Sequence, residues 1–411
     1  MKAKFSTLLM VMVLISMAFV STASAQNNIS NETQYSDKTD NISLEKARLV
    51  ASYYVQYVPN VTEKVEKFQD WNDATVKKSE IFYNLKGEKS AYAFNVTVNG
   101  EYSGYILISA TKDNYPVLEF SKGKIPSTIP KIKNKTESLV KEHVNKDNLT
   151  IGKAKPLYLG ATFYYAQYPL KNKQGKVVNN VTVDLTTPAI VKSNKSKIKK
   201  PVIEINSSRQ QKMKKEEAHR QWKSIEKRMS TGLSLSKAKV SSSELGWIDG
   251  VPAYEWYKGC SPTASAMVLG YWKNNGYPGF PEEITLIEEL ANAMGTSNWP
   301  EGTTWPIEID NGIEEVCDNH GYNNFDANND YYVSWNEVIN NVNSDEPFVI
   351  NMLSGGTGSG HSQPYGEHSV TCVGYSDNTE DYIFIHDTWD ENTHHIAFGN
   401  WGGAMATWVN P

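Results

Sequence analysis

Cysteine is scarce in this sequence, whose 411 residues include only Cys260, Cys317 and Cys372. Three cysteines cannot all pair, so at least one thiol is free, and a fold held together by several disulfides is excluded. The cysteines and histidines also show no CxxC or HxxxH spacing of the kind that binds zinc. We therefore expect the protein to work without a metal ion or another cofactor.

Basic residues are almost missing from the C-terminal part of the chain. Residues 245–411 contain two lysines, no arginine and 24 acidic residues, which gives a formal charge of −22. Residues 1–244 contain 39 basic and 22 acidic residues, which gives +17. An acidic segment repels nucleic acid, so DNA or RNA binding is not expected. The two halves can attract each other, although acidity can also serve solubility alone.

Long apolar runs are missing beyond the N-terminus. There, Lys2 and Lys4 precede an apolar run at residues 8–20 and the small residues "STASA" that end at Ala25. This order is typical of a signal peptide, predicted at residues 1–25. The run is too short for a comfortable membrane span, and no other run reaches its length. We expect a protein that has no membrane span and is secreted or lies at the extracellular surface.

Glycosylation sequons (Asn-x-Ser/Thr) occur only in the first half of the chain. They are consistent with export and predict a glycoprotein, although an asparagine-rich hydrated surface explains them equally well. The sequons begin at Asn28, Asn31, Asn41, Asn60, Asn95, Asn134, Asn148, Asn180, Asn194 and Asn206.

The pattern along the chain predicts several segments. We expect a helix that begins after a Ser43 cap, followed by alternating strands that are broken by a turn at Asn99-Gly100. Together they indicate a helix packed on an antiparallel sheet. The basic stretch has helical propensity but few apolar anchors, so we expect an exposed connecting helix that is open to cleavage between Lys192 and Lys239. The predicted segments are a polar stretch at 26–42, an α+β domain at 43–155, a β-rich extension at 156–191, a basic connecting helix or linker at 192–246 and a C-terminal domain at 247–411.

The stretch "GCSPTASAMVLGYW" places Cys260 at the predicted start of an apolar helix. We expect Ser261 to cap this helix and Pro262 to occupy its first turn. The positive end of the helix dipole favours a thiolate, which is the nucleophilic form of cysteine. The alternative is that Cys260, like Cys317 and Cys372, is a small core residue.

A nucleophilic cysteine needs a base and a group that orients the base. We assign the base to His368, at the start of the predicted strand "HSVTCVGY", and the orienting group to Asp387, at the end of "YIFIHDTW". Adjacent antiparallel strands would place the two side by side. The competing histidines are His320, His361, His386, His394 and His395, and Asp390 is the alternative to Asp387.

Residues 326–337 contain the acidic spacing of a calcium-binding loop. Asp326, Asn328, Asp330 and Glu337 occupy its positions 1, 3, 5 and 12, but Tyr331 replaces the glycine required at position 6. We interpret "VSWNEVINNV" instead as a helix start capped by Ser334.

The motifs "GCSPTASAMVLGYW", "EHSVTCVGY" and "IHDTW" resemble those of the C39-like cysteine peptidases of the papain-like fold, over residues 247–411. The resemblance implies an α+β domain in which a helix bears the nucleophile Cys260 and an antiparallel sheet bears the base His368 and the orienting Asp387. Residues 43–155 more weakly resemble the propeptides of streptopain-type peptidases, which implies that the first half of the chain is an inhibitory or chaperone-like pro-region.

The sequence departs from the family at the oxyanion site. Such peptidases usually have a glutamine about six residues before the cysteine, and the segment from Pro252 to Trp256 contains none. Tyr254 or Trp256 could donate a hydrogen bond in its place, whereas the carboxylate of Glu255 would repel a developing negative charge.

These features predict a secreted cysteine peptidase that is made as a zymogen and cleaves proteins or peptides with a Cys-His-Asp triad. The alternatives are a cysteine-dependent amidase or acyl transferase, and a catalytically silent surface-binding module of the same fold. We also expect the separated pro-region to inhibit the C-terminal domain in a salt-dependent manner, because exposed charges are screened by salt.

Overall fold

The computed structural model describes eight segments: residues 40–61, 68–144, 149–191, 208–230, 244–297, 302–355, 368–377 and 380–411. The predicted signal peptide, the polar stretch up to residue 39 and His361 lie outside these residues. We call the described residues up to 230 the N-terminal region and those from 244 onward the C-terminal region. Residues 40–411 form one compact unit.

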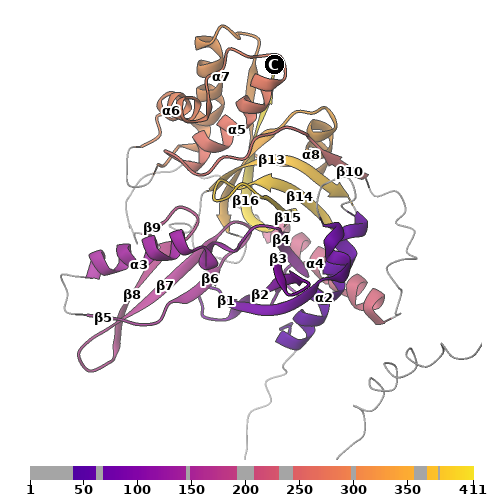
Figure 1. Cartoon of the computed structure of the whole chain (residues 1–411), viewed down its shortest axis with the longest axis vertical. Helices are drawn as coiled ribbons and strands as arrows, with labels where there is room; N and C mark the ends of the chain where they lie inside the picture. Colours follow the sequence, from indigo (N-terminus) through magenta and orange to yellow (C-terminus); the bar gives the residue numbers. More distant parts are fainter. Residues whose placement is uncertain are drawn as a thin grey trace, which may run out of the picture. The chain divides into compact units, whose positions relative to one another are not determined.

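The N-terminal region begins with a helix on an antiparallel sheet, as the sequence predicts (Figure 1). The Lys46 N–H donates to the Ser43 hydroxyl at 3.1 Å, which caps the helix. Asn99 and Gly100 both have positive φ angles, 52° and 87°, at the turn of the central hairpin. The elements are α2 (Leu44–Val61), β1 (Thr75–Tyr83), β2 (Lys89–Val98), β3 (Glu101–Ser109) and β4 (Val117–Ser121).

A second group of strands extends this sheet through one parallel pair, in which Tyr83 of β1 lies beside Leu157 of β6. From β6 the strand order continues to β7, β8 and β9. The elements are α3 (Pro130–Val144), β5 (Thr150–Ile151), β6 (Lys155–Tyr158), β7 (Tyr164–Lys171), β8 (Val177–Asp184) and β9 (Ala189–Ile190).

The basic segment forms α4 (Ser208–Ser230), which is anchored more firmly than the sequence predicts. Trp222 is buried, and its indole N–H donates to the Asn114 carbonyl at 2.9 Å. Ala218, four residues before Trp222, and Ile225, three residues after it, are also buried. These three apolar side chains share one helix face, and they bury that face although most residues of α4 are polar and many are exposed.

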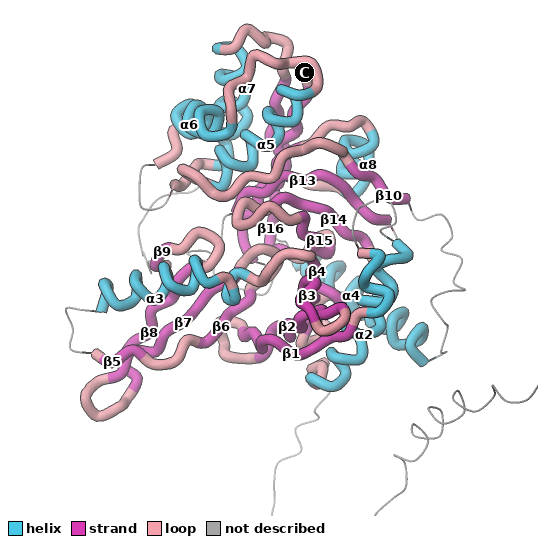
Figure 2. Tube along the Cα trace, viewed as in Figure 1, coloured by secondary structure: helices cyan, strands magenta, loops and turns pink. Residues whose placement is uncertain are grey.

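The C-terminal region places helices beside an antiparallel sheet. In Figure 2, α5, α6 and α7 lie close together, in agreement with their mutual contacts. The helices are α5 (Cys260–Asn274), α6 (Glu283–Ala293), α7 (Ile309–Asn319) and α8 (Trp335–Asn343). The strands are β10 (Glu244–Trp247), β11 (Asp326–Asp330), β12 (Phe348–Gly355), β13 (His368–Asp377), β14 (Asp381–His386), β15 (Thr393–Ala397) and β16 (Trp401–Asn410).

The sheets of the two regions are joined by an antiparallel pair between β4 and β15, whose labels lie together in Figure 1. His394 lies opposite Ser121, His395 opposite Phe120 and Ile396 opposite Glu119. We call this strand pair the seam. It makes one sheet of sixteen strands that runs from β11 at one end to β9 at the other.

The mixed helices and strands agree with the α+β class and with the arrangement predicted for the C-terminal domain, a helix bearing Cys260 and a sheet bearing His368 and Asp387. Among the described residues, no helix combines the length and the apolar character that crossing a membrane requires.

Candidate active site

Cys260 is the first residue of α5, and Gly259 is the residue that precedes the helix. The sequence predicts that Ser261 caps this helix, and the structure corrects this. Ser261 lies inside the first turn, and its hydroxyl is 2.8 Å from that of Ser369 on β13. Cys260 is partly buried and lies at the positive end of the helix dipole, which favours the thiolate.

Glycine is required where the chain enters α5. A Cβ atom on Gly259 would lie 2.6 Å from the Gly302 carbonyl oxygen, and one on Gly302 would lie 2.3 Å from the Lys258 carbonyl oxygen. Two backbone segments therefore touch directly beside Cys260. Either glycine, when replaced by a larger residue, would push these segments apart.

His368 begins β13 and is buried, and its hydrogen bond and charge act on Cys260. Burial alone would raise the pKa of the Cys260 thiol, but the bond and charge of His368 lower it below its ordinary value. Burial alone would likewise lower the pKa of His368, but Cys260 raises it. The two shifts are opposite in sign, as expected of a thiolate and imidazolium pair.

Ser369 is a site residue that sequence reasoning missed. Its main chain and its hydroxyl both help to lower the pKa of Cys260, after His368. The same hydroxyl donates to the Asn351 side chain at 2.5 Å, in the buried space between α5 and the sheet. The sequence offered one indication, since Ser369 directly follows His368. On a strand its side chain points to the opposite face from that of His368, but its N–H can still face a neighbouring element.

Asp387 contacts His368 with its backbone carbonyl and not with its side chain. The Nε2 atom of His368 is 2.9 Å from the Asp387 carbonyl oxygen, to which it donates. The Asp387 carboxylate is fully buried and lies 3.0 Å from Nε2 of His394 instead. Burial raises the pKa of Asp387 to about 7 against the attraction of His394. The side chain predicted to orient the base is thus paired with another histidine in this structure.

The turn after Asp387 has an unusual backbone. Thr388 is buried with a φ of 73°, a left-handed conformation that β-branched residues rarely adopt. Its carbonyl accepts a hydrogen bond from the Trp256 N–H, and the next residue, Trp389, stacks on His368 with ring centroids 6.2 Å apart. Backbone strain of this kind is often found at functional sites, where surrounding contacts hold it.

The two predicted oxyanion donors have different positions. The Tyr254 hydroxyl lies against Gly270, 2.7 Å from where a Cβ of Gly270 would be. Gly270 is ten residues along α5, about 15 Å of helix from Cys260, so the Tyr254 hydroxyl does not lie beside Cys260 in this structure. Trp256 is tied to Thr388 beside Asp387, and its indole N–H is buried with no partner among the described residues. Trp256 is the candidate that remains.

Four of the competing histidines are described, and each has other partners. His320 contacts Glu289 at 2.7 Å, and His386 contacts the Pro252 carbonyl at 3.0 Å. Burial lowers the pKa of His395 to about 3, and its ring stacks on Phe120. His394 contacts Asp387 and also Asp390, at 3.2 Å.

Asp387, Asp390 and His394 lie close enough together to hold a metal ion, as do Asp40, Asp113 and His219 at the surface. In the first group, burial opposes the charge of His394, but the two carboxylates raise its pKa well above the ordinary value. The three side chains form an ion-paired cluster around His394.

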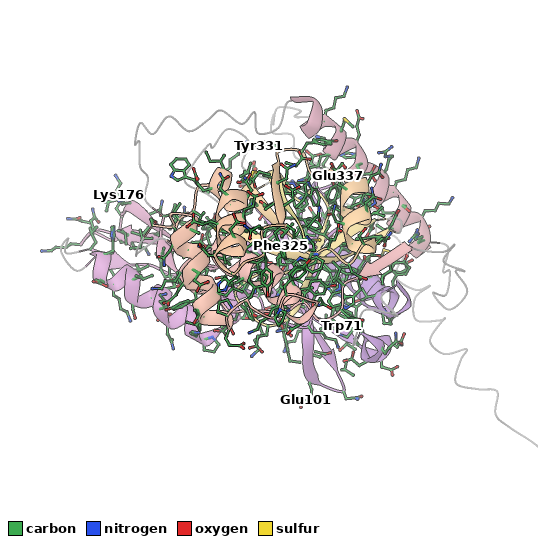
Figure 3. All side chains as sticks on the ribbon, turned by 90° about the horizontal axis from the view of Figure 1, so that it is seen from above. Trp71, Glu101, Lys176, Phe325, Tyr331 and Glu337 are labelled. Atoms are coloured by element: carbon green, nitrogen blue, oxygen red, sulfur yellow. The ribbon has the colours of Figure 1, made fainter. Side chains whose placement is uncertain are left out.

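The other two cysteines and the acidic loop have structural positions. Cys317 and Cys372 are buried, and burial raises the pKa of each to about 12. Residues 326–330 form the strand β11, and Glu337 closes the N-terminal cap of α8 together with Ser334. Figure 3 labels Glu337, which belongs to α8, and the exposed Tyr331, which follows β11 in the sequence. The spacing that suggested calcium thus lies on a strand and a helix cap.

Among the comparisons with known proteins, the one with protein families bears on the C-terminal region. A prointerpain A fragment from Prevotella intermedia is a similar solved structure, with 10% identity over 82% of this chain and 98% of the fragment, and a TM-score of 0.37. No curated protein has significant sequence similarity to the chain. Residues 248–407 match the peptidase C39 like family. This part of the chain is therefore a C39-like peptidase family domain.

Proposed function

We propose that the protein is a secreted cysteine peptidase, made as a zymogen, that hydrolyses peptide bonds in proteins or peptides. The observation that carries this proposal is the pairing of Cys260 with His368 at the start of α5, with pKa shifts that favour the charged pair. The family of residues 248–407 supports the same reaction.

The reaction follows from these groups. The Cys260 thiolate attacks the peptide carbonyl carbon, and a C–S bond forms. His368 then gives its proton to the leaving amine as the C–N bond breaks. Water attacks the resulting thioester while His368 takes its proton, which releases the acid and restores the thiolate. The Cys260 N–H and the unpaired indole N–H of Trp256 are the proposed donors to the oxyanion.

Export and glycosylation belong to the same proposal and are supported by the N-terminal sequence and the ten sequons. Expression in the native host should give an extracellular zymogen whose first residue is Gln26. A chain that keeps Met1 and stays inside the cell would contradict export. Loss of mass after treatment with a glycosidase would identify glycosylation separately.

The test of catalysis uses wild-type protein and the Cys260→Ala variant on casein and on peptide mixtures. Hydrolysis should disappear in the variant, and an unchanged rate would exclude the proposal. Mass spectrometry with an added amine separates a peptidase or amidase from an acyl transferase, which would join fragments to the amine. Alkylation with iodoacetamide at pH 6 separates an enzyme from a silent binding module, because only an activated thiol reacts at that pH.

A further inference from the structure

A line of buried contacts leads from the catalytic pair to a second histidine. His368 donates to the Asp387 carbonyl at 2.9 Å, and the Asp387 carboxylate lies 3.0 Å from Nε2 of His394. That nitrogen donates to Asp390 at 3.2 Å, so Asp387 forms an ion pair with it but no well-aligned hydrogen bond. Trp389 contacts both histidines, stacked on His368 and edge-on to His394 at 5.0 Å.

The other side of His394 is held by the N-terminal region. Its Nδ1 is 2.9 Å from the Tyr105 hydroxyl and 3.5 Å from the Glu119 carboxylate. Tyr105 donates to Glu119, and the Tyr164 hydroxyl donates to the other oxygen of Glu119 at 2.8 Å. All four side chains are buried. The N-terminal region thus supplies every contact described for Nδ1.

The charges in this cluster are interdependent. His394 is the cation among Asp387, Asp390 and Glu119, and these three carboxylates, two buried and one partly buried, would repel one another without it. The other titratable groups beside it are His386 and His395, whose pKa values burial lowers to about 4 and about 3. Both are therefore neutral near pH 7, and neither can replace His394 as the cation.

We propose that His394 is a positioning residue for the catalytic pair, and that the N-terminal region supports it through Glu119 and Tyr105. This inference rests on the proposed function of Cys260 and His368. His394 holds the Asp387 side chain, and this fixes the carbonyl of the same residue against His368. The docked N-terminal region then helps to set the reactivity of the nucleophile.

The test measures the rate of Cys260 alkylation by iodoacetamide between pH 5 and 9 in the full chain. Cys317 and Cys372 are buried, and the Cys260→Ala variant gives the background rate. In His394→Gln, the thiolate should form about one pH unit higher, so that the rate at pH 6 falls about tenfold. Glu119→Gln and Tyr105→Phe should produce smaller shifts in the same direction, with rates about threefold lower.

Matched controls break other contacts between the two regions and leave the side-chain contacts of His394 in place, although Ser121 lies opposite His394 in the strand pair. Ser121→Ala removes a 2.9 Å hydrogen bond to the Thr393 carbonyl in the same strand pair, and Tyr158→Phe removes a 2.8 Å bond to Asn400. Both should keep the wild-type pH profile. If they shift it as far as Glu119→Gln does, general loosening of the seam explains the effect and the inference is wrong.

Two measurements keep the result interpretable. Thermal unfolding identifies folded variants, and Tyr105→Phe, which loses only a hydroxyl, decides the question if His394→Gln does not fold. An unchanged profile in folded variants overturns the inference. If the profile shifts as expected but no variant, nor the wild type, hydrolyses peptides, then the positioning role stands and the peptidase proposal fails.

Discussion

Residues 1–244 and 245–411 carry formal charges of +17 and −22, and this difference suggests that charge brings the two together. The contacts between the N-terminal region and the C39-like domain are of another kind. The strands β4 and β15 pair, Phe120 stacks on His395 at 4.6 Å, and Tyr54 contacts Tyr382 at 6.0 Å. Net charge thus describes the long-range attraction of two regions, and not the contacts that join them.

Polar contacts between the regions are specific and mostly buried. Asn114 donates to the Asn400 side chain at 3.1 Å, and the Tyr382 hydroxyl donates to the Val117 carbonyl at 3.2 Å. By contrast, Lys131 and Glu255 form an ion pair at 2.9 Å whose side chains are both well exposed. Buried hydrogen bonds and aromatic packing respond weakly to salt, so the two classes of contact can be separated by experiment.

The largest expected effect comes from breaking the seam at Phe120. This side chain is 2% exposed and contacts the rings of Tyr54, Tyr382 and His395. Phe120→Ala should lower the free energy of unfolding by about 3–5 kcal/mol, because it leaves a cavity among aromatic rings. Urea unfolding of the full chain, followed by tryptophan fluorescence, measures this loss.

The matched control for Phe120 is Val178→Ala, since Val178 lies in the same region but is 52% exposed. It should change the free energy of unfolding by less than about 0.5 kcal/mol. A loss below about 1 kcal/mol for Phe120→Ala would show that the seam contributes little and that the regions are held by other contacts.

A smaller effect on the free energy of unfolding is expected from Asp381, a partly buried carboxyl near other acidic residues. Burial, followed by the charges of Asp377 and of Glu217 on α4, raises the pKa of Asp381 to about 7. A carboxyl with a raised pKa stabilises the fold in its protonated form, and this contribution is lost as pH rises from about 4 through about 7. Asp381→Asn should therefore stabilise the chain at pH 8 by roughly 1–2 kcal/mol, since water screens part of the effect, and should have little effect at pH 4.

Urea unfolding at pH 4 and pH 8 measures this difference. The control is Glu101→Gln, at an exposed position in the hairpin of β2 and β3. The change in the free energy of unfolding that this substitution causes should be the same at pH 4 and at pH 8. If Asp381→Asn stabilises the chain equally at both, the gain comes from packing and not from relief of charge repulsion.

Local patterns were sufficient to predict that Cys260 and His368 lie together. The apolar spacing after Cys260 identified α5, and the alternation after His368 identified β13, whose contacts with α5 bring their first residues together. The capping role assigned to Ser261 failed because a serine inside the first turn can bond to a neighbouring strand instead. Such a choice depends on tertiary contacts, which local propensity does not contain.

The arrangement around Asp387 could not be predicted from the sequence. Its side chain pairs with His394, and two other partners of His394, Tyr105 and Glu119, lie more than 270 residues earlier in the chain. Alternation along a strand indicates which side chains share a face, but it does not indicate which distant strand becomes the neighbour. The pairing of β4 with β15 is therefore information that only the structure supplies.

The smallest effect is expected from the exposed ion pair of Lys131 and Glu255. Such pairs contribute about 0.2–1 kcal/mol, because water and side-chain entropy offset most of their attraction. A double-mutant cycle with Lys131→Gln and Glu255→Gln should give a coupling in this range at 0.05 M salt and close to zero at 0.5 M.

The free energy of unfolding of the wild-type chain should fall by less than about 1 kcal/mol between 0.05 M and 0.5 M salt, because the seam is apolar and hydrogen-bonded. Urea unfolding at the two salt concentrations measures both quantities. A loss of several kcal/mol at high salt would instead favour the salt-dependent docking that the opposite net charges predict, and would mean that the seam is secondary to it.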